Sequence, residues 1–412
     1  MAGAETTARL PVVRLAEIAT KIGSGATPRG GKESYRAEGI SLIRSMNVHD
    51  FRFEYSGLAH IDGDQARALD NVTVEQDDVL LNITGASVAR CCMTPRGILP
   101  ARVNQHVAII RVKKTEADPC YVHYCLVSPQ YKDHLLSIAQ GGATREALTK
   151  EKIEEFRIPC PPLATQRKIA AILSAYDDLI ENNLRRIKIL EEMAQNLYRE
   201  WFVKFRFPGH EHARFVDSPL GRIPEGWEAV KVGSLLSRVR RPARVQKRHY
   251  AIEGPIPVVD QGRDFVGGYT DRDEALIEDG LPLIVFGDHT RVLKYIDFPF
   301  ACGADGTQLL KSDNVRMPMT LFYHALVSID LSDFAYARHF KLLKEELLAL
   351  PAASIAMLYD RFALSLRNQV SSLMERNDSL RATRDLLLPR LISGELDVSE
   401  LGIAASEAAA GV

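Results

Sequence analysis

The sequence predicts an α+β protein, a pseudo-two-fold tandem duplication in which two similar mixed α/β modules are separated by two long antiparallel helices. Three observations predict this class. Two stretches of about 35 to 40 residues show helical periodicity without Gly or Pro, and their apolar positions match when the numbering is shifted by 186 residues. The segments that precede the two stretches also share one order of apolar and polar runs. We therefore expect module and helix to occur twice.

The first helix is predicted from Gln166 to about Phe205 and the second from about Ser354 to Leu388. Ordinary start and stop signals flank both stretches. These are Pro161, Pro162 and Pro351 before the stretches, and Pro208, Gly209, Pro389 and Gly394 after them. At about 1.5 Å per residue each helix should reach roughly 50–60 Å. So long an apolar stripe needs a partner, and the other copy is the obvious one; core helices of two separate globular domains are the alternative.

The apolar positions of each helix are spaced by threes and fours and form one stripe, which predicts the core of the helix pair. In the first helix the stripe contains Ile169, Ile172, Tyr176, Ile180, Leu184, Ile187, Ala194 and Trp201. In the second helix it contains Ile355, Leu358, Phe362, Leu366, Val370, Leu373, Leu380 and Leu387. Leu190 breaks the match, because Arg376 stands at its partner position.

The two modules share an outline of apolar start, two strands that end in polar turns, and a charged helix followed by proline. The corresponding segments are VVRLAEIA and AVKVGSLL, DDVLLNITGAS and LPLIVFGDHT, ARVNQHVAIIRV and ACGADGTQLLK, and TREALTKEKIEEFRIP and YARHFKLLKEELLALP. Strict βαβ alternation is missing, so mixed or antiparallel sheets are expected. The predicted divisions are module one over 1–165, a helix over 166–206, module two over 207–351, a helix over 352–396, and a flexible tail over 397–412.

The bulk composition is typical of a globular cytoplasmic protein. The chain has 412 residues, 46% hydrophobic and 25% charged, which is enough for two or three domains. No uncharged apolar run is long enough to span a membrane, and the first residues resemble no export signal. The six cysteines contain no CxxC pair, so we expect reduced thiols and neither a zinc nor a redox site.

The charge balance neither supports nor excludes nucleic acid as a ligand. The net charge is −1, and one basic cluster, SRVRRPARVQKRHY, stands out, although a solvated loop explains it equally well. Two similar lobes carried on paired helices suit a target with two parts. Duplex DNA is such a target, because its major groove returns to the same face about every 34 Å.

Several segments resemble the specificity (S, or HsdS) subunits of type I restriction–modification enzymes. The resemblance covers nearly the whole chain and is strongest in PPLATQRKIAAILSAYDDLIENN, LYREWFVKF and RDLLLPRLISGELDV. In module one GATPRGG, LLNITGASVAR, VNQHVAII and GGATREALTKEKIEEFRIPCPP are also similar to the family. The second copy departs from the PPxxxQ helix start with LPAASIAMLYDRF, which leaves open whether both helix starts dock a partner in the same way.

The resemblance implies a function and a set of partners. The modules would be target recognition domains, each reading one half of a bipartite site in double-stranded DNA. The helices would be conserved spacers that set the gap and dock modification subunits, of which two are expected. Those subunits would carry S-adenosylmethionine and methylate adenine, and a restriction subunit would use ATP and Mg. This chain would be non-catalytic, with no cofactor, metal or membrane partner of its own.

Motifs for chemistry on this chain are missing from the sequence. The loop GSGATPRGGKES departs from a phosphate-binding loop, because Ala26 replaces the first glycine and Glu33 the hydroxyl residue. No Asn-Pro-Pro or Asp-Pro-Pro occurs to hold a flipped adenine. Asp177 and Asp178 are interpreted as a solvated helix face.

We expect DNA to be contacted by polar or basic side chains on loops and helix starts that strands hold in place. In module one they are Thr27, Arg29, Arg44, Asn82, Thr84, Ser87, Asn104, Gln105, Thr144 and Arg145. In module two they are Arg240, Arg241, Lys247, Arg248, Asp260, Gln261, Asp288, His289, Thr290, Asp305, Gln308, Arg338 and His339.

Two other functions remain open from the sequence. One is a coiled-coil adaptor whose modules bind other proteins, which charge neutrality fits well. The other is a nuclease or methyltransferase in its own right, which the missing motifs disfavour.

Overall fold

A computed structural model describes residues 10–141, 147–304, 306–331 and 338–402. Contacts divide the chain into two compact units. Unit 1 comprises residues 1–183 and 375–412, and unit 2 comprises residues 184–374. Each long helix therefore contributes one part to each unit. Over the described ranges, no helix is both long enough and apolar enough to cross a membrane.

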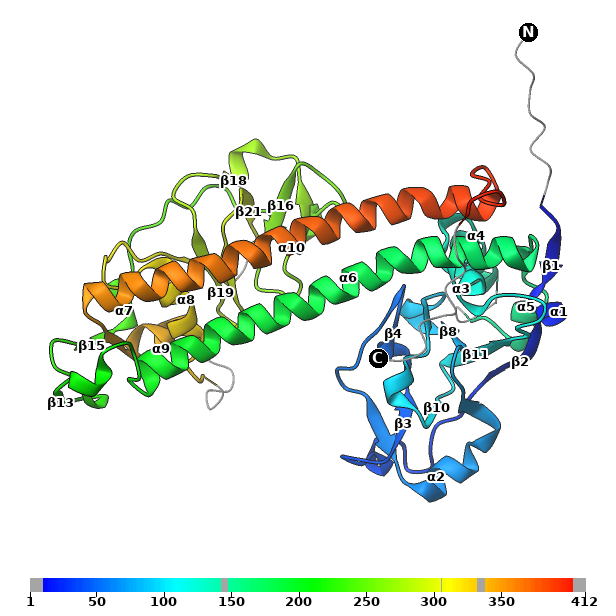
Figure 1. Ribbon diagram of the computed structural model, residues 1–412, viewed down its shortest axis with the longest axis horizontal. Helices are drawn as coiled ribbons and strands as arrows, with labels where there is room; N and C mark the ends of the chain where they lie inside the picture. The colour runs from blue at the N-terminus through cyan, green and yellow to red at the C-terminus, as the bar shows by residue number, and fades with distance from the viewer. Residues whose placement is uncertain (1–9, 142–146, 305, 332–337, 403–412) are drawn as a thin grey trace, which may run out of the picture. The chain divides into compact units, whose positions relative to one another are not determined.

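Unit 1 has two four-stranded sheets and two small antiparallel pairs (Figure 1). One sheet has the order β2-β11-β8-β9, all antiparallel, and the other has the order β6-β3-β10-β7, in which β3 and β10 are parallel. The strands are β1 (Val12–Arg14), β2 (Ala19–Ser24), β3 (Ile40–Ile43), β4 (Val48–His49), β5 (Arg52–Phe53), β6 (Ala59–Ile61), β7 (Thr73–Val74), β8 (Val79–Asn82), β9 (Cys91–Met93), β10 (Ala101–Val103), β11 (Val107–Val112) and β12 (Arg157–Pro159). The helices are α1 (Leu15–Ile18), α2 (Gly63–Ala68), α3 (Pro119–Val127), α4 (Pro129–Gln140) and α5 (Lys150–Glu154).

Unit 2 repeats this topology. Its sheet β17-β16-β21-β18 has the same order and strand senses as β6-β3-β10-β7, including the parallel central pair. Its sheet β20-β19-β22 matches β9-β8-β11, and β15 pairs with β23 as β1 pairs with β12. Among the described residues of unit 2, β2 and the β4–β5 hairpin have no counterpart. The repeated strand order confirms the duplication and the α+β class, because it does not depend on the apolar pattern of the sequence.

The elements of unit 2 have the following bounds. The strands are β13 (Phe215–Ser218), β14 (Gly221–Pro224), β15 (Glu228–Lys231), β16 (Ile256–Val259), β17 (Gly268–Thr270), β18 (Leu276–Ile277), β19 (Leu283–Gly287), β20 (Leu293–Ile296), β21 (Phe300–Cys302), β22 (Thr307–Leu310) and β23 (Leu347–Leu350). The helices are α7 (Val232–Leu235), α8 (Met319–Val327) and α9 (His339–Glu345).

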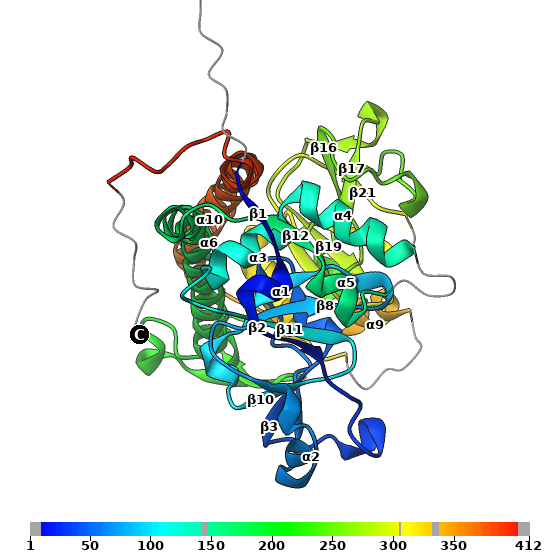
Figure 2. The same ribbon diagram turned by 90° about the vertical axis from the view of Figure 1, so that its right-hand side faces the viewer.

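The two long helices, α6 (Leu163–Tyr198) and α10 (Ala353–Ser393), lie side by side and antiparallel within each unit (Figures 1 and 2). In unit 1 Lys168 donates to the carbonyl of Ser399, and Asn183 donates to Asn377 at 2.9 Å. The contacted residue number falls from 399 to 377 as the residue number on α6 rises from 168 to 183, so the two segments are antiparallel. In unit 2 the hydroxyl of Tyr359 donates to the carbonyl of Ala194 at 3.3 Å.

Two of the residues predicted for the helix-pair core are at the surface instead. Leu184 is 41% exposed and Phe362 is 50% exposed. Helical spacing identifies an apolar stripe, but each helix packs against both its partner and a module, so the buried face is rotated from that stripe. Buried residues outside the predicted stripe therefore complete the core. They are Leu173, Tyr198, Ala356, Tyr359, Ala363 and Leu388.

The other predicted core residues are buried or half-buried. Six of them are buried: Ile169, Ile180, Ala194, Trp201, Val370 and Leu373. Eight are half-buried: Ile172, Tyr176, Ile187, Ile355, Leu358, Leu366, Leu380 and Leu387.

Pro389 does not end the second helix, contrary to the sequence prediction. It lies inside α10, which continues to Ser393. A proline this close to a helix end interrupts only the bond to the carbonyl four residues earlier. Gly394, with φ of 77°, provides the left-handed residue that follows the helix end.

Different side chains brace the starts of α6 and α10, which accounts for the departure in the second copy. Gln166 is buried; its amide oxygen accepts from the backbone N–H of Asp118 at 2.9 Å, and its amide nitrogen donates to the carbonyl of Pro161 at 2.8 Å. In unit 2 the guanidinium of Arg316 donates to the carbonyls of Leu350 and Pro351, at 3.0 and 2.6 Å. The PPxxxQ glutamine is therefore a structural brace in this chain.

A partly buried ion pair joins the two long helices in unit 1, and side chains of the module contact it. Arg384 donates to Asp177 at 2.5 Å, and the guanidinium lies 3.6 Å from the ring centroid of Phe51. The other carboxylate oxygen of Asp177 accepts from the hydroxyl of Tyr124 at 2.7 Å. The position of Asp177 on a charged helix suggested a solvated residue, and that prediction was wrong. Burial raises the pKa of its carboxyl group.

Candidate nucleic-acid interface

In both units, loops after three strands of the two main sheets converge at one edge. In unit 1 they follow β3, β8 and β10, and we call residues 44–47, 83–87 and 104–106 rim 1. In unit 2 they follow β16, β19 and β21, and we call residues 260–262, 288–290, 303–304 and 306 rim 2. The same backbone bond joins a loop of each rim to the last residue of a neighbouring strand: Asn104 N to Ile43 O at 3.0 Å, and Gly303 N to Val259 O at 2.8 Å.

A second backbone bond is also common to the two rims. Ile83 N donates to His106 O at 3.0 Å in rim 1, and Asp288 N donates to Gly306 O at 2.7 Å in rim 2. Both bonds tie the loop after the central strand of one sheet to the loop after a strand of the other. The two rims are therefore equivalent constructions with different side chains.

Rim 1 surrounds a hollow of about 470 Å³. It is lined by Ser45, Met46, Thr84, Gly85, Ala86, Ser87, Arg90 and His106. Thr84 and Ser87 were predicted from the sequence, whereas Ser45, Met46, Arg90 and His106 were missed. His106 lies within VNQHV, so the polar turn itself was the signal that could have identified it.

Two amides predicted to read bases are buried braces of rim 1. The amide nitrogen of Asn82 donates to the carbonyls of Ser45 and Val48, at 2.9 and 3.3 Å. Asn104 is also buried, and its side-chain oxygen accepts from the backbone N–H of His106 at 3.0 Å. The prediction that these two residues contact DNA was wrong, because both are buried. A polar side chain at the end of a strand can equally hold the next loop.

The remaining predicted residues of unit 1 differ in accessibility. Thr27 and Arg29 are exposed, and Gln65 holds both backbone groups of Arg29. Arg44 is half-buried, with its guanidinium 5.2 Å from the ring centroid of Tyr35 and a bond to the carbonyl of Gly57. Gln105 is half-buried in rim 1. The predicted residues Thr144, Arg145 and Asp305 lie outside the described residues.

In unit 2 the structure brings several predicted residues together at rim 2. The side-chain oxygen of Gln261 accepts from the backbone N–H of His289 at 3.2 Å, and the hydroxyl of Thr290 donates to the carbonyl of Gln261 at 2.7 Å. Nearby, Arg241 donates to the side chain of Gln308 at 3.1 Å.

Asp260 is braced within rim 2 by neighbouring groups. Its carboxylate accepts from the backbone N–H of Gly262 at 2.7 Å and from the hydroxyl of Tyr250 at 3.2 Å. Lys294, which the sequence analysis missed, is buried and donates to the carbonyls of Asp260 and Asp264, at 2.8 and 2.6 Å. Burial lowers the pKa of Lys294, and the two nearby aspartates oppose that shift.

Asp288 and His339 form a structural connection, contrary to the prediction that they read DNA. Both are buried. The carboxylate of Asp288 accepts from the backbone N–H of Phe340 at 2.8 Å, so it holds the first turn of α9. The backbone N–H of His339 donates to the carbonyl of Asp288 at 3.1 Å. Arg338, beside them, is exposed.

The basic segment of unit 2 is at the surface. Arg240, Arg241, Lys247 and Arg248 are all exposed. Arg240 also lines a hollow that contains several carboxylates, so part of its charge is balanced locally. Lys247 and Arg248 do not line that hollow and leave positive charge on this surface.

Buried polar atoms without a hydrogen-bond partner concentrate at the rims. Across the described ranges, five such side-chain atoms occur. Four belong to rim residues or to residues directly beside a rim: Arg44 Nε, Asn82 Oδ1, Gln105 Oε1 and Thr307 Oγ1. Asn82 and Thr307 are fully buried, so only the atoms of the half-buried residues Arg44 and Gln105 belong to side chains that a ligand could reach.

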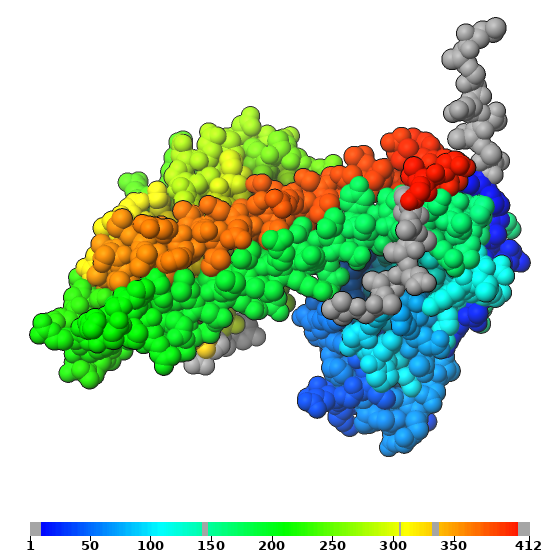
Figure 3. All heavy atoms as spheres, in the orientation of Figure 1, coloured from blue at the N-terminus to red at the C-terminus, as the bar shows by residue number. Residues whose placement is uncertain are grey.

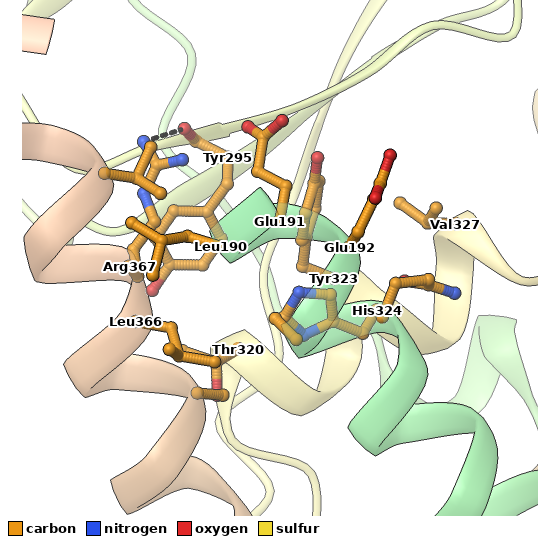
Figure 4. A pocket seen from close by; sticks show the side chains of 14 residues that line it. Leu190, Glu191, Glu192, Tyr295, Thr320, Tyr323, His324, Val327, Leu366 and Arg367 are labelled. Atoms are coloured by element: carbon orange, nitrogen blue, oxygen red, sulfur yellow. Dashed lines mark hydrogen bonds between the residues drawn. The ribbon is translucent and has the colours of Figure 1, made fainter. Parts of the chain in front are cut away.

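The fifth atom, Gln195 Oε1, belongs to a residue that lines a mostly apolar hollow of about 290 Å³ in unit 2 (Figure 4). Leu190 of α6, Leu366 of α10 and Tyr323 of α8 surround this hollow. Arg367 closes one side, where it donates to the carbonyl of Tyr295 at 3.3 Å.

Known proteins resemble this chain over most of its length. Residues 11–192 match the family model for the type I restriction modification DNA specificity domain. The type I restriction enzyme MjaIX specificity subunit of Methanocaldococcus jannaschii is 25% identical over 302 residues, which are 68% of this chain and 70% of that protein. The MjaVIII specificity subunit of the same organism is 30% identical over 161 residues, 39% of this chain and 36% of that protein.

A solved structure shares the fold. The crystal structure of the type I restriction–modification S subunit from M. genitalium has a TM-score of 0.56 and 15% identity, and the match covers 95% of this chain and 98% of that one. At this identity the likeness supports the architecture alone, and it agrees with the duplicated α+β topology.

Proposed function

We propose, because this chain belongs to the family of type I restriction–modification specificity subunits, that it reads a bipartite sequence in double-stranded DNA with one rim for each half-site. The observation that carries the proposal is the pair of equivalent rims, which present different polar side chains on one backbone framework. Different side chains on one backbone framework would let the two rims read different bases. Exposed Lys247 and Arg248 would add sequence-independent contacts to phosphates.

In this proposal the chain supplies recognition, and its partners supply the chemistry. Two modification subunits would bring S-adenosylmethionine and methylate adenine, and a restriction subunit would use ATP and Mg to translocate and cut. Over the described ranges no three His, Cys, Asp or Glu side chains are grouped to hold a metal ion. The role of this chain would be to place the bound sequence before those subunits.

Selection from a random duplex library tests the proposal. The chain is assembled with its modification subunits, bound duplexes are recovered at about 0.15 M salt, and their sequences are compared. We expect two short conserved blocks with a constant gap, bound roughly 10³-fold or more above random DNA. Recovery of random sequences at every salt concentration would refute the proposal and favour an adaptor that binds proteins.

The modification subunits are proposed to dock on the helix pair. In unit 2 the helices leave large apolar side chains in solvent, among them Ile189 at 54% and Met193 at 50% exposure on one face of α6. In Figure 3 the atoms of the unit 2 parts of α6, in green, and of α10, in orange, face the viewer. Exposed apolar surface of this kind, beside the hollow of Figure 4, is typical of a protein interface.

The double substitution Ile189→Asp and Met193→Asp should weaken association with the modification subunit by on the order of tenfold or more, because two charges would enter an apolar contact. Isothermal titration with the purified subunits measures the effect. Val315→Asp is the matched control, since Val315 is 65% exposed in unit 2 but lies off the helices. Equal affinities for the wild type and the double variant would exclude this face as the docking surface.

A further inference from the structure

The hollow of rim 1 contains three hydrogen-bonded side chains. The amide nitrogen of Gln105 lies 2.8 Å from Nε2 of His106. Nδ1 of the same ring lies 2.5 Å from Oγ1 of Thr84. The imidazole therefore holds the Thr84 hydroxyl in a fixed position in the hollow, where a hydroxyl can donate to a ligand.

The other polar side chains of this hollow can also donate. Ser45 and Ser87 contribute hydroxyls and Arg90 contributes a guanidinium, and no Asp or Glu belongs to the lining. Within the described part of the chain, no side chain or carbonyl forms a hydrogen bond or an ion pair with the Arg90 guanidinium. The hollow therefore carries a positive charge that no carboxylate of its own lining balances.

A ligand for this site must accept hydrogen bonds and tolerate or carry negative charge. In duplex DNA two groups meet this requirement, the O6 and N7 edge of guanine in the major groove and the oxygens of a phosphate. The two parallel N–H donors of the guanidinium fork match the paired O6 and N7 acceptors of guanine. The Thr84 hydroxyl, which lines the same hollow, is a further donor for an oxygen with two acceptor lone pairs. Rim 1 also places this fork among loops at strand ends, where it can approach a base edge.

We propose that the rim 1 hollow reads one guanine, with Arg90 donating to O6 and N7 and Thr84 donating beside it. This inference rests on the proposed function, because it names the base that one rim recognises. The chain from Gln105 through His106 makes Thr84 a positioned donor. The specificity of this position therefore depends on residues that do not themselves reach the DNA.

Library selection with variants of the assembled complex tests the inference. Arg90→Ala should abolish the preference for guanine at one position of one half-site, a loss of about 10- to 100-fold in discrimination, while the other half-site is unchanged. Arg90→Lys keeps the charge but lacks the fork, so it should lose most of the same preference. Arg157→Ala, an exposed arginine on β12, removes the same charge outside rim 1 and should leave the selected sequence intact.

Three results would overturn the inference. One is an unchanged selected sequence with Arg90→Ala, and another is a base other than guanine at the affected position. The third is equal weakening on all sequences with a salt dependence that becomes shallower by about one unit, which would identify a phosphate contact. Failure of the wild-type complex to select any sequence would instead refute the proposed function, so the two failures are distinguishable.

Discussion

Tyr359→Ala is expected to lower the free energy of unfolding of unit 2 by about 4 kcal/mol, the range for truncating a fully buried aromatic side chain. Tyr359 is fully buried and its ring has edge contacts with Trp201 and Phe202, at centroid distances of 6.0 and 5.0 Å. Its hydroxyl also lies 2.9 Å from Nδ1 of His324. The substitution therefore removes a ring and a polar contact at the junction of both helices with the module.

The fluorescence of Trp201 and Trp227 reports this unfolding, because both tryptophans of the chain are buried in unit 2. Phe362→Ala is the matched control: the ring is half exposed and contacts Trp201 at its edge, so a loss of about 1 kcal/mol is expected. Similar losses for the two variants would show that the buried face of α10 is assigned incorrectly.

Arg384→Ala should destabilise unit 1 by about 3 kcal/mol, because it leaves the carboxylate of Asp177 buried with only the Tyr124 hydroxyl as a partner. The guanidinium also covers the ring of Phe51, so the substitution opens a space beside the β4–β5 hairpin. Hydrogen exchange of α3 amides against urea measures the loss within unit 1, which contains no tryptophan.

Two further variants separate the charge from the packing. The double substitution Arg384→Leu with Asp177→Leu should recover most of the loss, since an apolar pair replaces a buried ion pair with little cost. Arg381→Ala, which breaks only an exposed pair with Asp378, should change stability by less than about 0.5 kcal/mol. If Arg384→Ala behaves like Arg381→Ala, the buried pair contributes nothing to unit 1.

Local patterns were sufficient to predict the duplication and the two helices. Helical periodicity and flanking prolines identify a helix because both act within a few residues along the chain. The turns NITGAS and VNQH were placed correctly for the same reason, and they now form rim 1. The continuation of α10 through Pro389 was missed, because the position of a proline relative to the helix end is not visible in a local signal.

Only the tertiary structure decided which polar side chains face outward. Asn82 ends β8 and Asp288 follows β19, each within two residues of Thr84 or His289. Asn82 and Asp288 hold neighbouring segments, whereas Thr84 lies at the hollow and His289 at the surface. The pairing of Asp177 with Arg384 joins residues 207 positions apart, which no local pattern indicates. Periodicity and turn chemistry depend on neighbours in sequence, so the sequence alone determined the helices and the turns. The partners of a side chain depend on which distant segments fold beside it, so only the tertiary structure decided them.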